Sequence, residues 1–272
     1  MTLTRDPDTY TSEWQAWHQA HEAARADGHG FLAVTGLHWL TERPQSLDDA
    51  PGEWWSDADG VHVTLDAAEG VTLDGVTLEG THDFGPIPER GGVTLLRGDV
   101  AIEVARRGGH DIVRPRDPQN PLRVQYAGTP TYFPAPEWVL EGRYVAFDAP
   151  RPTTVGSVAD GLEHVYDAPG QVTFEINGTP QALTAFPGGA EGALLVLFTD
   201  ATSGVTTYPA NRSLAVAPPD DEGRVILDFN HAVNLPCAYT DHATCPLPPE
   251  ENRLSFAVEA GEKLPVERGG HR

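Results

Sequence analysis

Apolar and polar positions follow two different periods along this chain. Over residues 12–27 the apolar side chains recur at helical spacing and place Trp14 and Trp17 on one stripe. Ser12 and Gln15 have the spacing of a capping box, and a glycine directly follows the segment. The pattern predicts one amphipathic helix over 12–27, with both tryptophans packed into the core.

From about residue 53 onward the period changes to two, which indicates strands. Turn residues separate many of these short runs, among them Asp74-Gly75, Arg97-Gly98-Asp99 and Asn177-Gly178. Strands are also expected at 194–198, 225–229 and 254–258. Many short strands joined by tight turns predict a mainly β chain. We expect an antiparallel β-sandwich or an open barrel, with the single N-terminal helix packed on it.

The domain division follows from the same change of period. Residues 1–50 form the expected N-terminal helix and docking segment, and residues 51–272 form the β domain. Proline is dense over 114–152. This stretch is either an ordered crossover within one β domain or the connection between two β modules.

The charge balance excludes several classes of partner. The chain has 272 residues and a net charge of -22, and Lys263 is the only lysine among its 18 basic residues. Such an acidic surface repels both nucleic acid and anionic membranes. The excess of acid over lysine fits either a salty cytoplasm or a GC-rich genome.

The compartment is predicted from segments that the sequence lacks. No apolar run reaches the ~18 residues that span a bilayer. The first ten residues contain neither the basic region nor the apolar run of a signal peptide. We therefore expect a cytoplasmic protein, in which the two cysteines stay reduced.

The segment 227–254 concentrates the residues that carry chemistry. It contains both cysteines, two histidines, several prolines and a run of Asp and Asn residues. Prolines fix the backbone of such an irregular segment, so its polar groups are expected to converge. The sequence therefore places the candidate site in this C-terminal loop.

The C-terminal third also resembles the domain of unknown function 1684 family. The resemblance rests on residues 199–204, Tyr208, Arg212, 228–230, 234–237, 244–249, 251–254 and 260–263. Looser matches lie upstream, at residues 36–40 and at 106–108 leading to Arg114. The family has no assigned activity, so the resemblance implies a fold-sized unit with a site, and no substrate.

Polar residues of this region form the predicted ligand-binding set: Tyr208, Arg212, Asn230, Asn234 and Asn252. The planar fork of an arginine suits a carboxylate or a phosphate, and Asp228 would orient it or transfer a proton. Equally, an Arg212–Asp228 ion pair would close the loop, with the asparagines capping turns.

Cys237, His242 and Asp228 are the candidate catalytic residues. A cysteine nucleophile requires a nearby base and a lowered pKa. Alternatively, the H-x5-C-x4-H-x2-C spacing of His231, Cys237, His242 and Cys245 would give a zinc site. The interpretation that we favour is structural: two thiols lie close together, free or joined by a disulfide, without a bound metal.

Two arginines and a histidine flank a second, upstream Gly-rich turn. Arg106, Arg107 and His110 fit either a small anion pocket or a solvated hairpin tip.

For the whole chain we predict a small polar or anionic ligand, bound by a binding protein or by an enzyme of the hydrolase or transferase type. The alternative is a non-catalytic structural or protein-interaction module, with or without zinc. The sequence identifies no cofactor, no substrate and no oligomeric state.

Overall fold

The computed structural model of the chain describes residues 7–266. Contacts divide the chain into two compact units. Of the described residues, unit 1 comprises 7–22, 128–239 and 245–266, and unit 2 comprises 23–127 and 240–244. The boundary expected near residue 50 falls inside unit 2.

Helix α1 spans Pro7–Arg25, so it begins five residues before the predicted start. Proline suits the first helical position, where its missing N–H costs nothing. The capping-box interpretation of Ser12 is wrong, because its hydroxyl donates to the carbonyl of Asp8, one turn earlier, at 2.9 Å. Trp14 is buried as predicted, whereas Trp17 is half-buried, and its ring lies 4.0 Å from that of His231, centroid to centroid.

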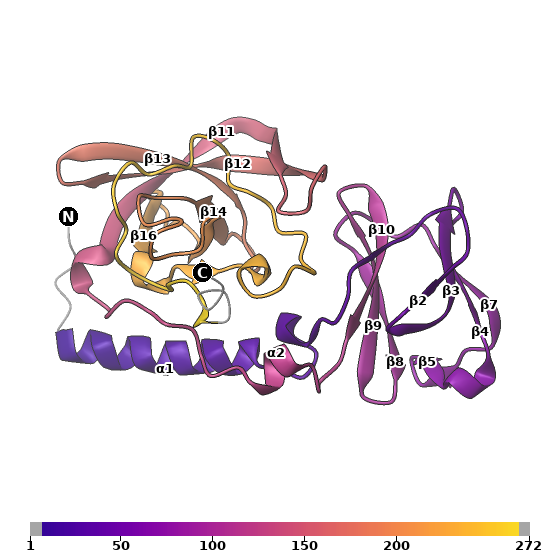
Figure 1. Cartoon of the computed structure of the whole chain (residues 1–272). Helices are drawn as coiled ribbons and strands as arrows, with labels where there is room; N and C mark the ends of the chain where they lie inside the picture. The colour runs from indigo at the N-terminus through magenta and orange to yellow at the C-terminus, as the bar shows by residue number, and fades with distance from the viewer. Residues whose placement is uncertain (1–6, 267–272) are drawn as a thin grey trace. The chain divides into compact units, whose positions relative to one another are not determined.

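Unit 1 contains a seven-stranded antiparallel sheet (Figure 1). The predicted Asn177-Gly178 turn joins two of its strands, and both turn residues have positive φ, 52° and 74°. The sheet order is β16-β11-β12-β13-β14-β15-β17. The bounds are β11 (Val139–Gly156), β12 (Glu163–Ile176), β13 (Thr179–Pro187), β14 (Leu194–Phe198), β15 (Arg212–Val216), β16 (Arg224–Asp228) and β17 (Val233–Asn234).

The core of unit 1 is built around three phenylalanines. The ring of Phe229 lies 5.7 Å from Phe174 and 5.6 Å from Phe198, centroid to centroid. Unit 1 also contains three short 3-10 helices: η3 (Pro136–Trp138), η4 (Phe229–His231) and η5 (Pro236–Ala238).

The strand predicted at 254–258 does not form. The amide of Val258 donates to Asp200, and the carbonyl of Val258 accepts from Arg212. Buried side chains thus satisfy backbone groups that would otherwise require a neighbouring strand.

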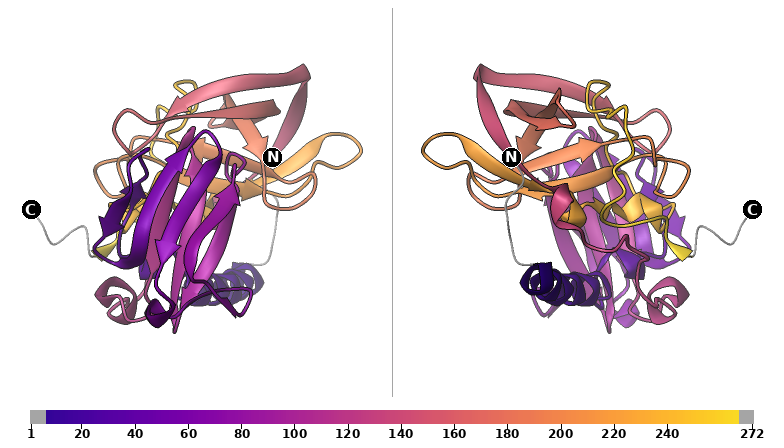
Figure 2. Two further views of the ribbon diagram at one scale, coloured as in Figure 1. Left: turned by 90° about the vertical axis from the view of Figure 1, so that its right-hand side faces the viewer. Right: turned by 90° about the vertical axis from the view of Figure 1, so that its left-hand side faces the viewer.

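Unit 2 consists of two antiparallel sheets, with strand orders β1-β10-β9-β8-β5-β6 and β2-β3-β4-β7. Its strands carry the indigo-to-magenta colours in Figure 2. Their bounds are β1 (His38–Trp39), β2 (Gln45–Leu47), β3 (Ala50–Asp57), β4 (Gly60–Leu65), β5 (Val71–Leu73), β6 (Val76–Thr77), β7 (Gly80–Gly85), β8 (Gly92–Arg97), β9 (Val100–Arg107) and β10 (His110–Arg116). The shorter elements are η1 (Phe31–Ala33), η2 (Ala67–Glu69) and α2 (Pro121–Val124).

The two sheets of unit 2 enclose one apolar core. Trp54 and Val63 from the four-stranded sheet pack with Leu95, Ile102 and Val104 from the six-stranded sheet, all fully buried. The predicted fold class is therefore confirmed: the described chain is mainly β, antiparallel and sandwich-like, with one N-terminal helix. No helix in the described residues is long and apolar enough to span a bilayer.

Candidate functional site

Arg212, the predicted anion ligand, lies in the interior of unit 1. Its guanidinium pairs with Asp200 at 2.8 Å, and both side chains are 1% exposed. The same group donates to the carbonyls of Val258, Ala260 and Glu262. Of the two alternatives for Arg212, the ion pair with Asp228 is therefore wrong in its partner, because Arg212 pairs with Asp200. Arg212 holds the irregular segment 258–262 against strand β15, and this enclosure favours a structural role.

Asp228 ends strand β16 and connects it to helix α1. Its carboxylate accepts the hydroxyl of Tyr10 at 2.8 and 2.9 Å and both the backbone and side-chain amides of Asn230 at 3.1 and 2.9 Å. His231 approaches at 3.8 Å, beyond hydrogen-bonding distance. These contacts orient the carboxylate within the protein.

The three predicted asparagines clamp backbone segments. Asn230 bonds both the amide and the carbonyl of Ala135, and Asn252 bonds both backbone groups of Thr184. Asn234 donates to the carbonyl of Lys263 at 2.8 Å. Asparagine side chains of this kind replace ladder bonds in irregular segments.

Cys237 and Cys245 are buried thiols that lie close together, and this proximity is expected from the sequence. The amide of Cys237 lies 3.4 Å from the sulfur of Cys245. The hydrogen bond to Cys245 and then burial raise the pKa of Cys237, which opposes formation of a thiolate. Tyr208, half-buried, also hydrogen-bonds Cys237. This environment is unfavourable for a cysteine nucleophile.

His242 belongs to the segment 240–244, which groups with unit 2, and its amide donates to the hydroxyl of Thr240 at 3.1 Å. Within residues 7–266, no group of three or more His, Cys, Asp or Glu side chains is arranged to hold a metal ion.

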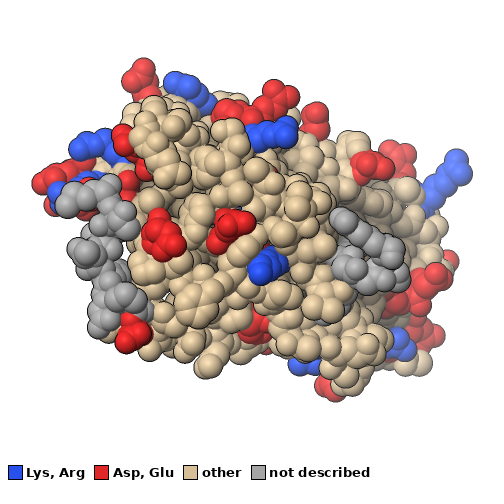
Figure 3. Space-filling model, turned by 60° about the vertical axis from the view of Figure 1, so that its left-hand side comes forward, with Lys and Arg blue, Asp and Glu red and all other residues tan. Residues whose placement is uncertain are grey.

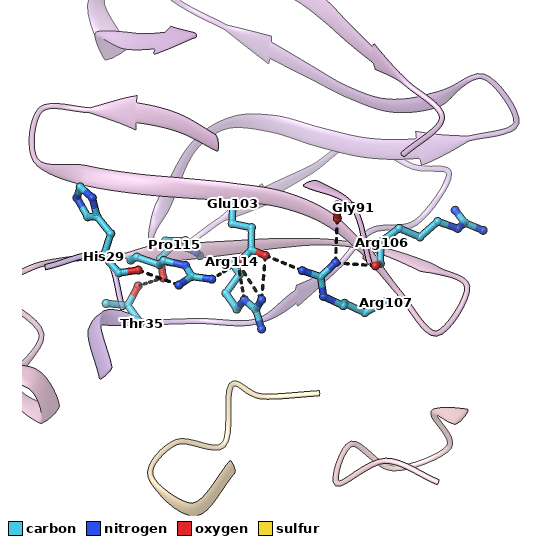
Figure 4. Close-up of polar contacts among 9 residues, drawn as sticks. His29, Thr35, Gly91, Glu103, Arg106, Arg107, Arg114 and Pro115 are labelled. Carbon is cyan, nitrogen blue, oxygen red and sulfur yellow. Dashed lines mark hydrogen bonds and ion pairs between the residues drawn. The ribbon is translucent and has the colours of Figure 1, made fainter. Parts of the chain in front are cut away.

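A cluster of positive charge surrounds Glu103, on the six-stranded sheet of unit 2. Arg114 donates to both carboxylate oxygens of Glu103 at 2.9 Å each, and Arg107 donates to one of them at 2.9 Å. Arg116 donates to the other oxygen. Figure 4 shows Arg107 and Arg114 converging on Glu103. Three guanidinium groups therefore face one carboxylate.

Alternation along the strands builds this arrangement. Thr94, Glu103 and Arg114 are directly paired across β8, β9 and β10, so their side chains lie on one face of the sheet. The opposite face carries the buried Ile102 and Val104 of the core. Glu103 and Arg107 of β9 and Arg114 and Arg116 of β10 thus share the face opposite this core.

A hollow of about 410 Å³ opens beside these side chains, and we call it the arginine pocket. Small residues on β8 and β9 leave room there, and polar side chains surround it. Its lining residues are His29, Arg90, Gly91, Gly92, Thr94, Ala101, Glu103, Arg107 and Arg116.

The charges of the pocket are held in place by protein contacts. Burial raises the pKa of Glu103, but Arg114 and Arg116 outweigh it and keep the pKa below its ordinary value. Glu103 is therefore ionised near neutral pH. Burial lowers the pKa of Arg114 and Glu103 opposes this effect, yet an arginine stays protonated at neutral pH. The pocket keeps a surplus of positive charge within a protein of net charge -22.

The sequence leaves open whether Arg106, Arg107 and His110 form an anion pocket or a solvated hairpin tip, and of the three Arg107 lines the arginine pocket. Neither Glu103 nor Arg116 is among the candidate site residues expected from the sequence, although the hairpin turn between β9 and β10 indicates which residues face each other. A two-residue turn at Gly108-Gly109 fixes the register of β9 against β10 and places Glu103 opposite Arg114.

Comparison with known proteins identifies the family. The family model described as "Protein of unknown function (DUF1684)" matches residues 124–263. The chain belongs to this family. The match lies mostly in unit 1 and does not reach residues 29–116, which carry the arginine pocket. Membership of the DUF1684 family therefore assigns no role to the pocket.

The chain is also similar to the uncharacterized protein from gene locus rrnAC0354 of Haloarcula marismortui, whose solution structure was solved by NMR. The identity is 31%, and the match covers 53% of this chain and 80% of that protein, with a TM-score of 0.44. No curated protein matches this chain.

Proposed function

We propose that this DUF1684 protein binds a small anionic molecule in the arginine pocket. The observation that carries the proposal is the convergence of Arg107, Arg114 and Arg116 on the single carboxylate of Glu103, beside an open hollow. Guanidinium groups present several N–H donors in a planar fork that suits carboxylate and phosphate oxygens. A ligand of the predicted kind, small and anionic, would thus bind away from Arg212.

The acidic excess of the protein favours the arginine pocket over the rest of the surface as a place for an anion. Asp and Glu outnumber Lys and Arg by 40 to 18 in the whole sequence. In the view of Figure 3, charged side chains gather mainly at the margins of a largely uncharged face. An anion approaching most of such a protein meets neutral or acidic groups, so a local surplus of arginine is where it would be retained.

The contacts support binding more than catalysis. The raised pKa of Cys237 and the internal hydrogen bonds of Asp228 favour structural roles for both predicted catalytic residues. The cytoplasm stays our proposed compartment, because the thiols of Cys237 and Cys245 persist in a reducing environment.

Thermal unfolding in the presence of small anions tests the proposal. At constant ionic strength, a ligand present at about 100 times its Kd stabilises a folded protein by ~2.7 kcal/mol. We expect a panel of small carboxylates and phosphates to contain compounds that raise the melting temperature. Replacing Arg116→Gln should abolish the increase, whereas Arg43→Gln should preserve it, because Arg43 is an exposed arginine of unit 2 outside the pocket. Equal increases in both variants would refute the pocket as the site.

A further inference from the structure

The charge balance of the arginine pocket narrows the class of ligand, and the inference rests on the proposed function. We propose that the natural ligand presents two negative charges on neighbouring oxygens, as a phosphate monoester or a compact dicarboxylate does. In the cluster around Glu103, Arg107, Arg114 and Arg116 each contribute one positive charge, and Glu103 neutralises one of the three. Arg90 also lines the hollow and has a contact of its own. Two positive charges of the cluster are left in excess, and a dianion balances them.

The donors are placed to reach one compact group. Arg107 binds one oxygen of Glu103, Arg116 binds the other, and Arg114 bridges both. The guanidinium groups therefore converge on the Glu103 carboxylate, and a ligand in the hollow would lie beside that carboxylate. A phosphate group or two adjacent carboxylates can contact more than one guanidinium group at the same time.

Donor capacity remains after the internal bonds are made. A guanidinium carries five N–H donors. Arg114 spends only Nε and one terminal nitrogen on Glu103, and its other terminal nitrogen makes no hydrogen bond within the described residues. Arg116 uses one terminal nitrogen on Glu103 and the other on the carbonyl of His29 at 2.8 Å. Arg116 lines the hollow, so its remaining N–H groups are available there to a second anion. Arg114 does not line the hollow and contributes charge rather than donors.

The lining of the pocket indicates a polar body attached to the anionic group. The hollow of about 410 Å³ falls in the size range of small-molecule sites, which is roughly 300–1,000 Å³. Thr94 supplies a hydroxyl, the glycines and Ala101 supply space, and His29 lies at the rim, where its Nε2 bonds the carbonyl of Asp99 at 2.8 Å. We therefore expect a small hydroxylated or amide-bearing organic dianion.

Glu103 has a distinct role in this account. Its carboxylate holds the three arginines together, but it also competes with a ligand for their donors. Glu103→Gln keeps the shape of the side chain and removes its charge. This substitution should strengthen the binding of a dianion about tenfold, provided that the fold is retained.

Calorimetric titration with a matched pair of probes tests the inference on the unaltered protein. Methyl phosphate carries close to two charges at about pH 8, because its second pKa lies near ~6, whereas dimethyl phosphate carries one. Malonate and acetate form the corresponding carboxylate pair. At constant ionic strength we expect the dianion of at least one pair to bind at least about tenfold tighter than its monoanion. The pair with the larger ratio identifies the natural ligand as a phosphate or a dicarboxylate.

The outcomes separate this inference from the proposed function. If monoanions and dianions of both pairs bind equally well, the dianion inference is wrong and anion binding stands. If none of the four probes binds and no small anion raises the melting temperature, both are wrong. In Arg116→Gln the preference for the dianion should fall. A preference that Arg116→Gln leaves unchanged would overturn the assignment to this pocket.

Discussion

Glu103 and Arg114 stand opposite each other in the β9–β10 ladder, and two hydrogen bonds of 2.9 Å join their side chains. Such a paired fork is a rigid arrangement, because both nitrogens and both oxygens are engaged. The pair therefore fixes the centre of the arginine cluster. The same pair leads to the first prediction, on stability.

Glu103→Ala should lower the free energy of unfolding by about 3 kcal/mol, since it leaves three neighbouring guanidinium groups without their shared carboxylate. The side chains of Glu103 and Arg114 are only 12% and 13% exposed, so water compensates poorly. Urea unfolding measures the change, with the exposed Glu79→Ala as control. A loss no larger than that of the control would contradict the account.

Arg212→Ala should destabilise unit 1 by about 3–5 kcal/mol, because it leaves the buried Asp200 without its partner and three carbonyls without their donor. Arg253→Ala is the matched control, because Arg253 is an exposed arginine of the same unit. Denaturant unfolding of both variants decides the point. Near-wild-type stability of Arg212→Ala would restore Arg212 as a candidate ligand-binding residue.

Cys237 should be unreactive in the folded protein. Its hydrogen bond to Cys245 and its burial raise its pKa, so almost no thiolate exists at pH values at which iodoacetamide modifies free cysteines. Mass spectrometry should find Cys237 unmodified in the native state and alkylated in concentrated guanidinium chloride. Native-state alkylation at the rate of a free thiol would return Cys237 to consideration as a nucleophile.

His62 should make the stability of unit 2 depend on pH. Its two ring nitrogens lie 2.5 Å from Asp83 and 2.9 Å from Asp57, and it stacks on Trp55. The hydrogen bond to Asp83 raises the pKa of His62; burial opposes this and Asp57 adds to it. The stabilisation is therefore complete below the unfolded pKa of about 6.5 and is lost as the pH rises through the higher folded pKa.

Melting curves of the wild type and His62→Gln check this sign. The difference in melting temperature between the two proteins should be larger at about pH 5.5 than at about pH 8.5. The hydrogen bond to His62 lowers the pKa of Asp57, so Asp57 loses its stabilising charge only at acid pH. Both pH values of the comparison lie above that pH. A difference that grows toward alkaline pH would show that the charged form of His62 is not the stabilising one.

Local sequence patterns predicted the strands and turns well, because each depends on neighbouring residues. The Asn177-Gly178 turn and the apolar run 194–198 appear in the structure as expected. The helix start was missed because Ser12 has the spacing of a cap while the helix already begins at Pro7. In the sequence, a capping pattern inside a longer helix cannot be distinguished from one at the start of a helix.

The candidate site could be predicted only in part. The partner of Arg212 is Asp200, and that choice depends on how the irregular segment 258–262 folds over both residues, which no periodicity encodes. By contrast, the pairing of Glu103 with Arg114 follows from counting outward from Gly108-Gly109. The surplus positive charge comes from two further residues: Arg116, two positions after Arg114 on β10, and Arg107, four positions after Glu103 on β9.

Amide chemical shifts provide the most direct test of the central claim, that an anion binds in the arginine pocket. A titration of the 15N-labelled protein with methyl phosphate and with malonate should shift the backbone amides of Gly91, Gly92, Thr94 and Ala101 most strongly. The same titration of Arg116→Gln should leave them nearly unmoved. If the largest shifts instead fall within residues 228–262, the ligand binds at the C-terminal loop and the arginine pocket is not the site.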